Sequence, residues 1–298
     1  MKPVSKRRKG PRDPLLWFGA VFMVFLVFLA MFGPTVREKQ LSSISKHQPY
    51  TSVYDDIADP FQSRSATFPF GTDSQGRDNL ARIAAGARIS LTVGLIVEII
   101  ALVVGVTVGV LGVFAPRWIA SAVMRLTDAM FAFPDILLAI LIIGIIQTSK
   151  AQIPGGKLAP VIAALGVTSW PSIARLVRAQ VATLKDREFV VAAKATGAST
   201  FYNVTRHILP QLAGILLAIA MIDIAGTILA ESTLSFLGIG VQAPEPSWGS
   251  MINNARENMN SYPAQLIAPC LFLSLTCFAL NFVGDGLRSY FDPKSTSR

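Results

Sequence analysis

The chain has 298 residues, of which 52% are hydrophobic and 15% are charged, and its mean hydropathy is +0.50. This composition excludes an ordinary soluble domain, in which about a quarter of the residues are charged. The net charge is +9, but the basic residues stand beside apolar segments and not on one recognition face, so they do not indicate a nucleic-acid-binding protein. The sequence predicts an integral membrane protein.

Six apolar segments are long enough to cross a bilayer, for which a helix needs about 20 mainly apolar residues. The expected spans are Leu15–Phe32, Leu91–Phe114, Met130–Gln147, Leu158–Leu176, Ile208–Leu229 and Gln265–Val283. Pro134, Pro160 and Pro171 interrupt or border the third and fourth segments, whose bounds are therefore the hardest to place. The fold class expected is all-α, with about six transmembrane helices.

The first apolar segment follows a basic N-terminal region, residues 1–14. A secretory signal peptide has the same basic start, but its apolar run is about 7–15 residues and a small-residue cleavage site follows. Here the run is longer and no such site follows clearly, so we expect an uncleaved first helix at residues 15–33.

Residues 34–89 are predicted to form an outer loop that ends in an interfacial helix. Leu80, Ile83, Ala84 and Ala87 fall on one helical face between Arg77 and Ser90, a pattern typical of an amphipathic helix lying on the membrane surface. A plain extension of the second span is the alternative.

Small residues recur every four positions in the second span, at Ala101, Gly105 and Gly109. Such a row allows two helix backbones to approach closely. We expect it to pack against another helix, within the chain or on a partner.

A polar, basic stretch at residues 186–206 separates the fourth and fifth spans. Asp186 is a candidate N-cap for a helix through Ala195, and Gly197 stands where a helix end favours a left-handed residue. Ser199 can cap a second helix that runs to Pro210. The predicted helix–turn–helix has small apolar faces and would dock into another protein.

The stretch at 186–206 and an outer segment at 232–263 belong to a five-helix core, residues 90–285, which is followed by a tail at 286–298.

The charges beside the spans predict the orientation of the chain in the membrane. With both termini inside, 17 of the 27 Lys and Arg residues lie on the inner side. Basic residues concentrate on the cytoplasmic side, so the stretch at 186–206 is expected in the cytoplasm.

The same stretch carries a family resemblance. Ala192-Ala193, Gly197 and Leu209-Pro210 fit the "EAA" pattern of permease subunits of ATP-binding-cassette (ABC) importers: EAA, three residues, Gly, nine residues, I-x-L-P. Two positions depart from that pattern, because Val191 replaces the usual Glu and His207 replaces the usual Ile.

Further motifs resemble the second permease subunit of the dipeptide/oligopeptide/nickel branch of these importers. They are FGTDSQGRD (Phe70 to Asp78) with GARISLTVG (Gly86 to Gly94), ESTLSFLGIG (Glu231 to Gly240), PSWGSMI (Pro246 to Ile252) and NFVGDGLRSYFDP (Asn281 to Pro293). The resemblance therefore covers most of the chain, from about Phe70 to Pro293.

This resemblance implies the fold of a type I ABC importer permease in the bacterial cytoplasmic membrane. A coupling helix would enter a cleft on an ATPase subunit, and the implied coupling residues are Glu188, Ala192, Ala193, Gly197, Leu209 and Pro210. The implied partners are a second homologous permease, one or two ATPase subunits and an extracytoplasmic solute-binding protein, with ATP and Mg bound by the ATPases.

Motifs for catalysis are absent from the sequence. The only Gly-rich stretch near a lysine, residues 154–158, lacks the GxxxxGK[ST] spacing, and no GxSxG, HExxH or CxxC occurs. The two histidines, His47 and His207, are predicted on opposite sides of the membrane and cannot share a metal ion. We expect no enzyme activity, no metal site and no cofactor in this chain.

Two carboxylates, Glu98 and Asp223, are expected at membrane depth, where ionisable groups are costly and often functional. Asp223 either lines the pathway and attracts a peptide amino group or a cation, or accepts hydrogen bonds from a neighbouring helix. The resemblance predicts a carboxylate at neither position. Glu231, at the outer end of the fifth span, is interpreted as a cap or an anchor.

The substrate stays open at this level. Peptides are favoured, and nickel or another small solute is the alternative. A different class, a secondary transporter driven by an ion gradient, would use Glu98 and Asp223 as proton or cation relays, but the internal repeat typical of such folds is not evident.

Overall fold

The computed structural model describes residues 13–42, 57–149 and 156–291. Residues 1–12 of the predicted basic N-terminus, His47 and residues 292–298 of the predicted tail lie outside the described residues. The long helices are α1 (Pro14–Ser42), α2 (Asn79–Phe114), α5 (Ala159–Leu184), α8 (Leu209–Phe236) and α10 (Pro263–Phe291). The shorter elements are α3 (Arg117–Phe131), α4 (Asp135–Thr148), η1 (Gly156–Leu158), α6 (Glu188–Ala195), α7 (Thr200–Asn203), η2 (Val204–Ile208) and α9 (Trp248–Arg256).

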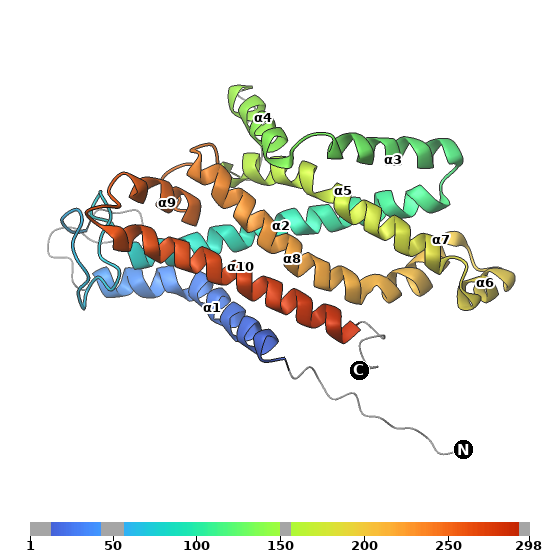
Figure 1. Cartoon of the computed structure of the whole chain (residues 1–298), viewed down its shortest axis with the longest axis horizontal. Coiled ribbons are helices and arrows are strands. Elements are labelled where there is room, and N and C mark those ends of the chain that lie inside the picture. Colours follow the sequence, from blue (N-terminus) through green and yellow to red (C-terminus); the bar gives the residue numbers. More distant parts are fainter. Residues whose placement is uncertain (1–12, 43–56, 150–155, 292–298) are drawn as a thin grey trace, which may run out of the picture.

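The long helices run roughly along the long axis of the molecule, with α2 packed against α1, α5 and α8 (Figure 1). The α6–α7 region lies at one end and α9 lies at the opposite end (Figure 1). The start of α1 and the end of α10 point towards the α6 end, which is the arrangement that an N-in, C-in topology with a cytoplasmic 186–206 stretch requires. Within the described residues, five helices are long and apolar enough to cross a membrane, or six if α3 and α4 count as one broken span.

The predicted third span, Met130–Gln147, is wrong as a continuous helix. α3 ends at Phe131, α4 begins at Asp135, and the two helices are bent by 95°. Pro134 has no N–H to donate and disfavours helical backbone in the residue before it, which accounts for the break. The 14 residues of α4 extend about 21 Å, less than the roughly 30 Å of a bilayer core.

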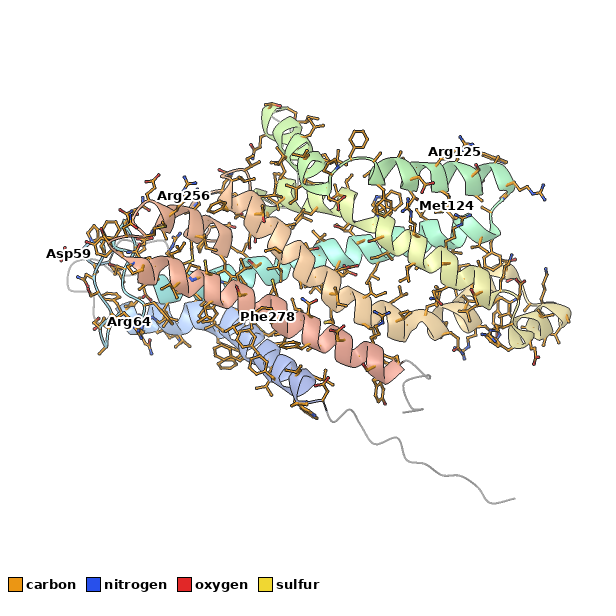
Figure 2. All side chains as sticks on the ribbon, viewed as in Figure 1. Asp59, Arg64, Met124, Arg125, Arg256 and Phe278 are labelled. Atoms are coloured by element: carbon orange, nitrogen blue, oxygen red, sulfur yellow. The ribbon has the colours of Figure 1, made fainter. Side chains whose placement is uncertain are left out.

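α3 packs by one narrow face. Met124 and Thr127 are its buried residues, whereas Arg125 points away from the bundle (Figure 2). Asp128 of α3 binds Arg175 of α5 at 2.6 Å, and this ion pair is exposed.

α1 is longer than the predicted 15–33, because the helix continues through Pro34 to Ser42. Its large side chains face outward: Trp17 is 64% exposed and Val24 is 71% exposed. In a bilayer such side chains contact lipid, so the exposure fits a peripheral helix that packs mainly on α2 and α10.

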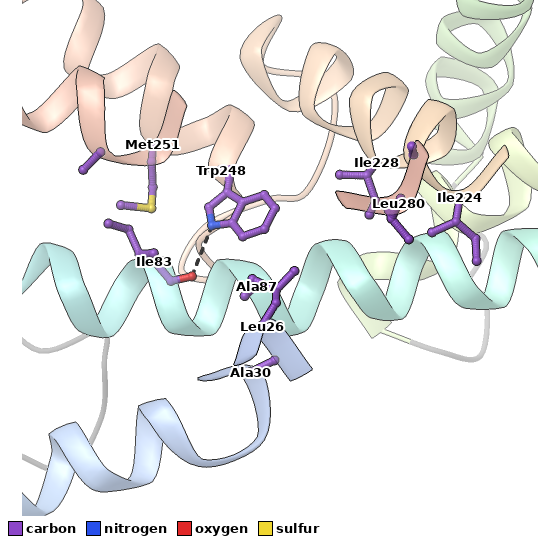
Figure 3. Close-up of a cluster of buried hydrophobic side chains, with 11 residues drawn as sticks. Leu26, Ala30, Ile83, Ala87, Ile224, Ile228, Trp248, Met251 and Leu280 are labelled. Carbon is purple, nitrogen blue, oxygen red and sulfur yellow. Dashed lines mark hydrogen bonds between the residues drawn. The ribbon is translucent and has the colours of Figure 1, made fainter. Parts of the chain in front are cut away.

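The helix predicted between Arg77 and Ser90 is not a separate interfacial helix, because residues 79–90 open α2, a helix of 36 residues or about 54 Å. The alternative, an extension of the second span, is therefore the correct one. Ile83, Ala84 and Ala87 are fully buried in the protein. The indole Nε1 of Trp248 in α9 donates to the Ile83 carbonyl at 3.2 Å (Figure 3). The apolar face that suggested a membrane surface is therefore covered by the chain's own helices.

The row of small residues in α2 packs within the chain. A β-carbon on Gly105 would lie 2.7 Å from Ile173, and one on Gly109 would lie 2.7 Å from Val177, both on α5. Any larger residue at these two positions would push α5 away. The predicted close helix packing is confirmed, and its partner is α5.

The FGTDSQGRD motif connects the outer segment to helices α1 and α2. Asp78 is 1% exposed, caps α2 by accepting from the Ala81 N–H at 3.1 Å, and accepts from the Arg37 Nε of α1 at 2.8 Å. Arg37 also donates to the Thr67 carbonyl at 2.8 Å. This motif therefore has a structural role at the outer end of the molecule.

Replacing Asp78 with alanine is expected to destabilise the protein strongly, because it leaves the Arg37 charge buried without its partner. Breaking a buried ion pair in this way costs about 3–5 kcal/mol. Asp128→Ala is the matched control, since its ion pair with Arg175 is exposed and such pairs contribute about 0–1 kcal/mol. Thermal unfolding of the two purified variants in detergent measures the difference, and equal stability losses would contradict a structural role for Asp78.

Candidate functional site

The α6–α7 region begins one residue later than predicted. The N-cap of α6 is Arg187, whose backbone is extended and whose side chain makes no capping hydrogen bond, so the predicted N-cap at Asp186 is wrong. The Arg187 N–H donates to the Leu184 carbonyl at 3.1 Å, which places Asp186 in the tight turn after α5. A residue inside that turn cannot serve as the cap of the next helix.

The predicted helix end at Gly197 is confirmed. Gly197 has φ +90°, a left-handed conformation that favours glycine. Its N–H donates to the Lys194 carbonyl at 3.0 Å, and the Ala198 N–H donates to the Ala193 carbonyl at 3.0 Å. This pair of bonds is a Schellman motif, which satisfies the carbonyls left open at the end of α6.

The predicted cap at Ser199 is confirmed, because its hydroxyl accepts from the Tyr202 N–H at 3.2 Å. The predicted end of the second helix at Pro210 is wrong. α7 passes through a π-helical turn, η2, directly into α8, so Thr200–Phe236 is one helical segment. Pro210 has no N–H for the regular ladder, and a local widening of the helix is a common way to accommodate such a residue.

Large apolar side chains are exposed on α6 and α7. Phe189, Val191, Phe201 and Tyr202 are 42%, 53%, 78% and 51% exposed, and we name these four residues the coupling surface. Tyr202 and Phe189 were missed by the sequence pattern, because the EAA-type motif marks only small residues and the glycine. A patch of this kind at one end of a helical bundle is typical of a docking site for another protein.

The six predicted coupling residues lie in this same region. Glu188, Ala192, Gly197 and Pro210 are exposed, whereas Ala193 and Leu209 are partly buried.

Val190 joins the coupling surface to the bundle. It is 5% exposed and belongs to a buried cluster that includes Val181 of α5, Ile208 at the end of η2 and Leu212 of α8. Val190 therefore places α6 against a cluster that both long helices share.

Asp223 lines a cavity of about 380 Å³ formed by the α3–α4 break, α5 and α8. Asp223 stands half-way along α8 and is half-buried. Four hydroxyl side chains and a second carboxylate also line the cavity: Thr168, Ser169, Ser172, Thr227 and Asp135. The sequence could not indicate this cavity, because Asp135 reaches it only through the break between α3 and α4.

Glu98 does not line the cavity. Glu98 is 2% exposed in α2, and within the described residues its Oε1 has no hydrogen-bond partner. Gly94, one helical turn before Glu98, faces Ile224 and Ile228 of α8, so this part of α2 packs on the part of α8 that carries Asp223. The two carboxylates predicted at membrane depth are therefore brought near each other, with Asp223 on the cavity side.

Glu231 is an anchor, as the sequence suggested. It is fully buried and accepts from the hydroxyls of Ser90 at 3.1 Å and Ser235 at 2.7 Å. Ser235 in turn accepts from the Val241 N–H at 3.0 Å. These bonds connect α2, α8 and the outer segment, which explains the ESTLSFLGIG motif without a role in binding.

Comparison with known proteins identifies relatives over almost the whole chain. It is 35% identical over 286 residues to the dipeptide transport system permease protein DppC of Alkalihalophilus pseudofirmus, covering 96% of this chain and 88% of that protein. It is 35% identical over 288 residues to the glutathione transport system permease protein GsiD of Escherichia coli, covering 96% and 89%.

A solved structure shares the fold. The chain aligns with a chain of the MetNI methionine ABC transporter, from a crystal form with inward-facing conformations, at a TM-score of 0.57 and 20% identity, covering 71% of this chain and 96% of that one. Residues 70–297 match the family described as the binding-protein-dependent transport system inner membrane component, and the chain belongs to this family.

Proposed function

We propose that this chain is a permease subunit of an ATP-driven importer of peptides, coupled to ATPase subunits through α6. The observation that carries the proposal is the exposed coupling surface at the inner end of the bundle, bounded by the Gly197 turn. Its relatives named as dipeptide and glutathione permeases, similar over 96% of the chain, support peptides as the substrate class.

The coupling mechanism follows from the packing of α6. The helix docks in a cleft of an ATPase subunit through Phe189 and Val191, with Glu188 and Ala192 on the exposed part of the helix. When ATP binding closes the ATPases, α6 moves, and Val190 transmits this movement to α5 and α8. Since α5 and α8 both line the cavity with Asp223, closure of the ATPases changes the shape of the cavity.

The complete importer contains a second homologous permease, one or two ATPase subunits and an extracytoplasmic solute-binding protein. ATP and Mg are bound by the ATPase subunits, whose closure drives the conformational change of the permeases. The membrane chain itself contributes the pathway and the docking helix.

Nickel or another small solute is the alternative substrate for the same mechanism, and no specific contact favours it. An ion-gradient-driven transporter would leave the coupling surface without a partner. It would also need Glu98 and Asp223 to exchange ions with both sides of the membrane, whereas Glu98 is almost completely buried.

Co-purification combined with uptake tests this proposal. The chain is tagged, extracted in mild detergent, and its partners are identified by mass spectrometry; the purified complex is then reconstituted with its binding protein in liposomes. We expect a second permease and ATPase subunits, and peptide uptake that requires ATP. A chain that purifies without a nucleotide-binding partner, or uptake that follows an ion gradient without ATP, would refute the proposal.

A further inference from the structure

The ionisable side chains that line the cavity at Asp223 are acidic among the residues that the structure describes. The charged residues among its lining side chains are Asp135 and Asp223, and no Lys or Arg lines it among the residues that the structure describes. The guanidinium of Arg175 lies 3.8 Å from the centre of the Phe131 ring at the edge of the cavity, but it is bound to Asp128.

Three hydroxyl groups of the cavity already donate their protons to backbone carbonyls, so their oxygens can accept hydrogen bonds from a ligand. Ser169 donates its proton to the Leu165 carbonyl at 2.6 Å, Thr168 donates to the same carbonyl at 3.1 Å, and Ser172 donates to the Ser169 carbonyl at 3.2 Å. A hydroxyl has one proton to donate and two lone pairs, so each oxygen retains the capacity to accept. The cavity therefore offers carboxylate and hydroxyl oxygens to a ligand that donates.

From this geometry we infer that the cavity is a subsite for a primary ammonium group, and that it takes the free amino terminus of a peptide in transit. An ammonium group has three donors and no acceptor, which matches the lining. A volume of about 380 Å³ lies within the range of small-ligand pockets. This inference rests on the proposed function for the identity of the ligand as a peptide.

A metal ion fits the site less well. Among the residues that the structure describes, no three His, Cys, Asp or Glu side chains converge closely enough to hold a metal ion. A lining that combines carboxylate and hydroxyl oxygens suits an ammonium group, whose three donors point in different directions.

Binding of two peptides to the complete detergent-solubilised complex, without its binding protein, tests the subsite. Equilibrium dialysis compares Ala-Ala with N-acetyl-Ala-Ala, which lacks the ammonium group. We expect the wild-type complex to bind Ala-Ala about tenfold more tightly, because a hydrogen-bonded charge pair contributes that much. Asp223→Asn should remove the preference, and Asp223→Glu should retain it.

Asp285→Asn is the matched control, since Asp285 is an exposed carboxylate of α10 that does not line the cavity. The control is expected to bind both peptides as the wild type does. Equal binding of the two peptides by the wild type, or an unchanged preference in Asp223→Asn, would overturn the inference. Displacement of Ala-Ala by Ni²⁺ but not by methylammonium would overturn it in favour of a metal site.

Binding and uptake measured together distinguish failure of the proposed function from failure of the ammonium subsite. If the wild-type complex binds Ala-Ala in an amine-dependent way but shows no ATP-driven uptake in liposomes, the ammonium subsite stands and the importer proposal fails. If uptake requires ATP but binding ignores the amino group, the importer proposal stands and the subsite is refuted.

Discussion

Replacing Gly197 with arginine is expected to abolish ATP-driven uptake while the transmembrane helices remain folded. Gly197 has φ +90°, and a residue with a β-carbon pays about 1–2 kcal/mol to adopt a left-handed conformation. No atom lies within 4 Å of the position that the β-carbon would take, so the substitution creates no clash with the bundle. The effect is expected because arginine strains the turn after α6 and adds a charge to the surface that we propose contacts the ATPase.

The measurement compares uptake, ATP hydrolysis and subunit retention in reconstituted complexes. Gly156→Arg is the matched control, because Gly156 also has a positive φ, +66°, and open space around it, but it lies outside the α6–α7 region. Gly197→Ala separates backbone strain from charge and should reduce uptake only partly. Wild-type uptake and wild-type stimulation of ATP hydrolysis in Gly197→Arg would count against the coupling role of α6.

Filling the cavity from α8 is expected to block transport of every peptide. Gly226 lines the cavity one helical turn from Asp223, and a β-carbon at this position would meet no atom within 4 Å. Gly226→Leu therefore adds an isobutyl group at the wall of the cavity with no clash at its β-carbon. We expect uptake to fall to background for di- and tripeptides alike, with normal subunit assembly.

Gly144→Leu controls for the added apolar bulk. A β-carbon on Gly144 of α4 would also have no atom within 4 Å, but this glycine does not line the cavity. Its substitution is expected to leave uptake unchanged. If Gly226→Leu transports peptides at the wild-type rate while the complex is intact, the cavity is not part of the pathway.

In the proposed mechanism, these two variants act at opposite ends of one mechanical connection. Gly197 lies in the turn between α6 and α7, which carry the coupling surface, and Gly226 lines the cavity that the α3–α4 break, α5 and α8 form. Val190 of α6 belongs to the buried cluster that also contains Val181 of α5 and Ile208 of η2. This connection predicts that both Gly197→Arg and Gly226→Leu lose peptide uptake. Only Gly197→Arg is expected to lose the coupling between ATP hydrolysis and uptake.

Local sequence properties determined the class of the protein and the form of its coupling region. Long apolar segments predict membrane helices because the hydrocarbon core requires about 20 apolar residues in one run. The turn at Gly197 and the cap at Ser199 were predictable because each depends on the residue's own backbone preference and on hydrogen bonds a few residues away. The motif resemblance added the family, which the comparisons confirm.

Tertiary structure alone decided which apolar faces meet protein and which meet lipid. The face of Ile83 and Ala87 has the pattern of an interfacial helix, but Trp248, more than 160 positions further along the chain, covers it. Periodicity records that a face is apolar and carries no information about what buries it.

The cavity depends on the same kind of long-range placement. Asp223 and Asp135 line one space only because α3 and α4 break at Pro134 and bend by 95°. The sequence determined the carboxylates and the proline, whereas the packing of α5 and α8 against that break determined that they face a common cavity. Contacts between residues about 90 positions apart cannot be derived from local preferences, because each helix is compatible with many arrangements of its neighbours.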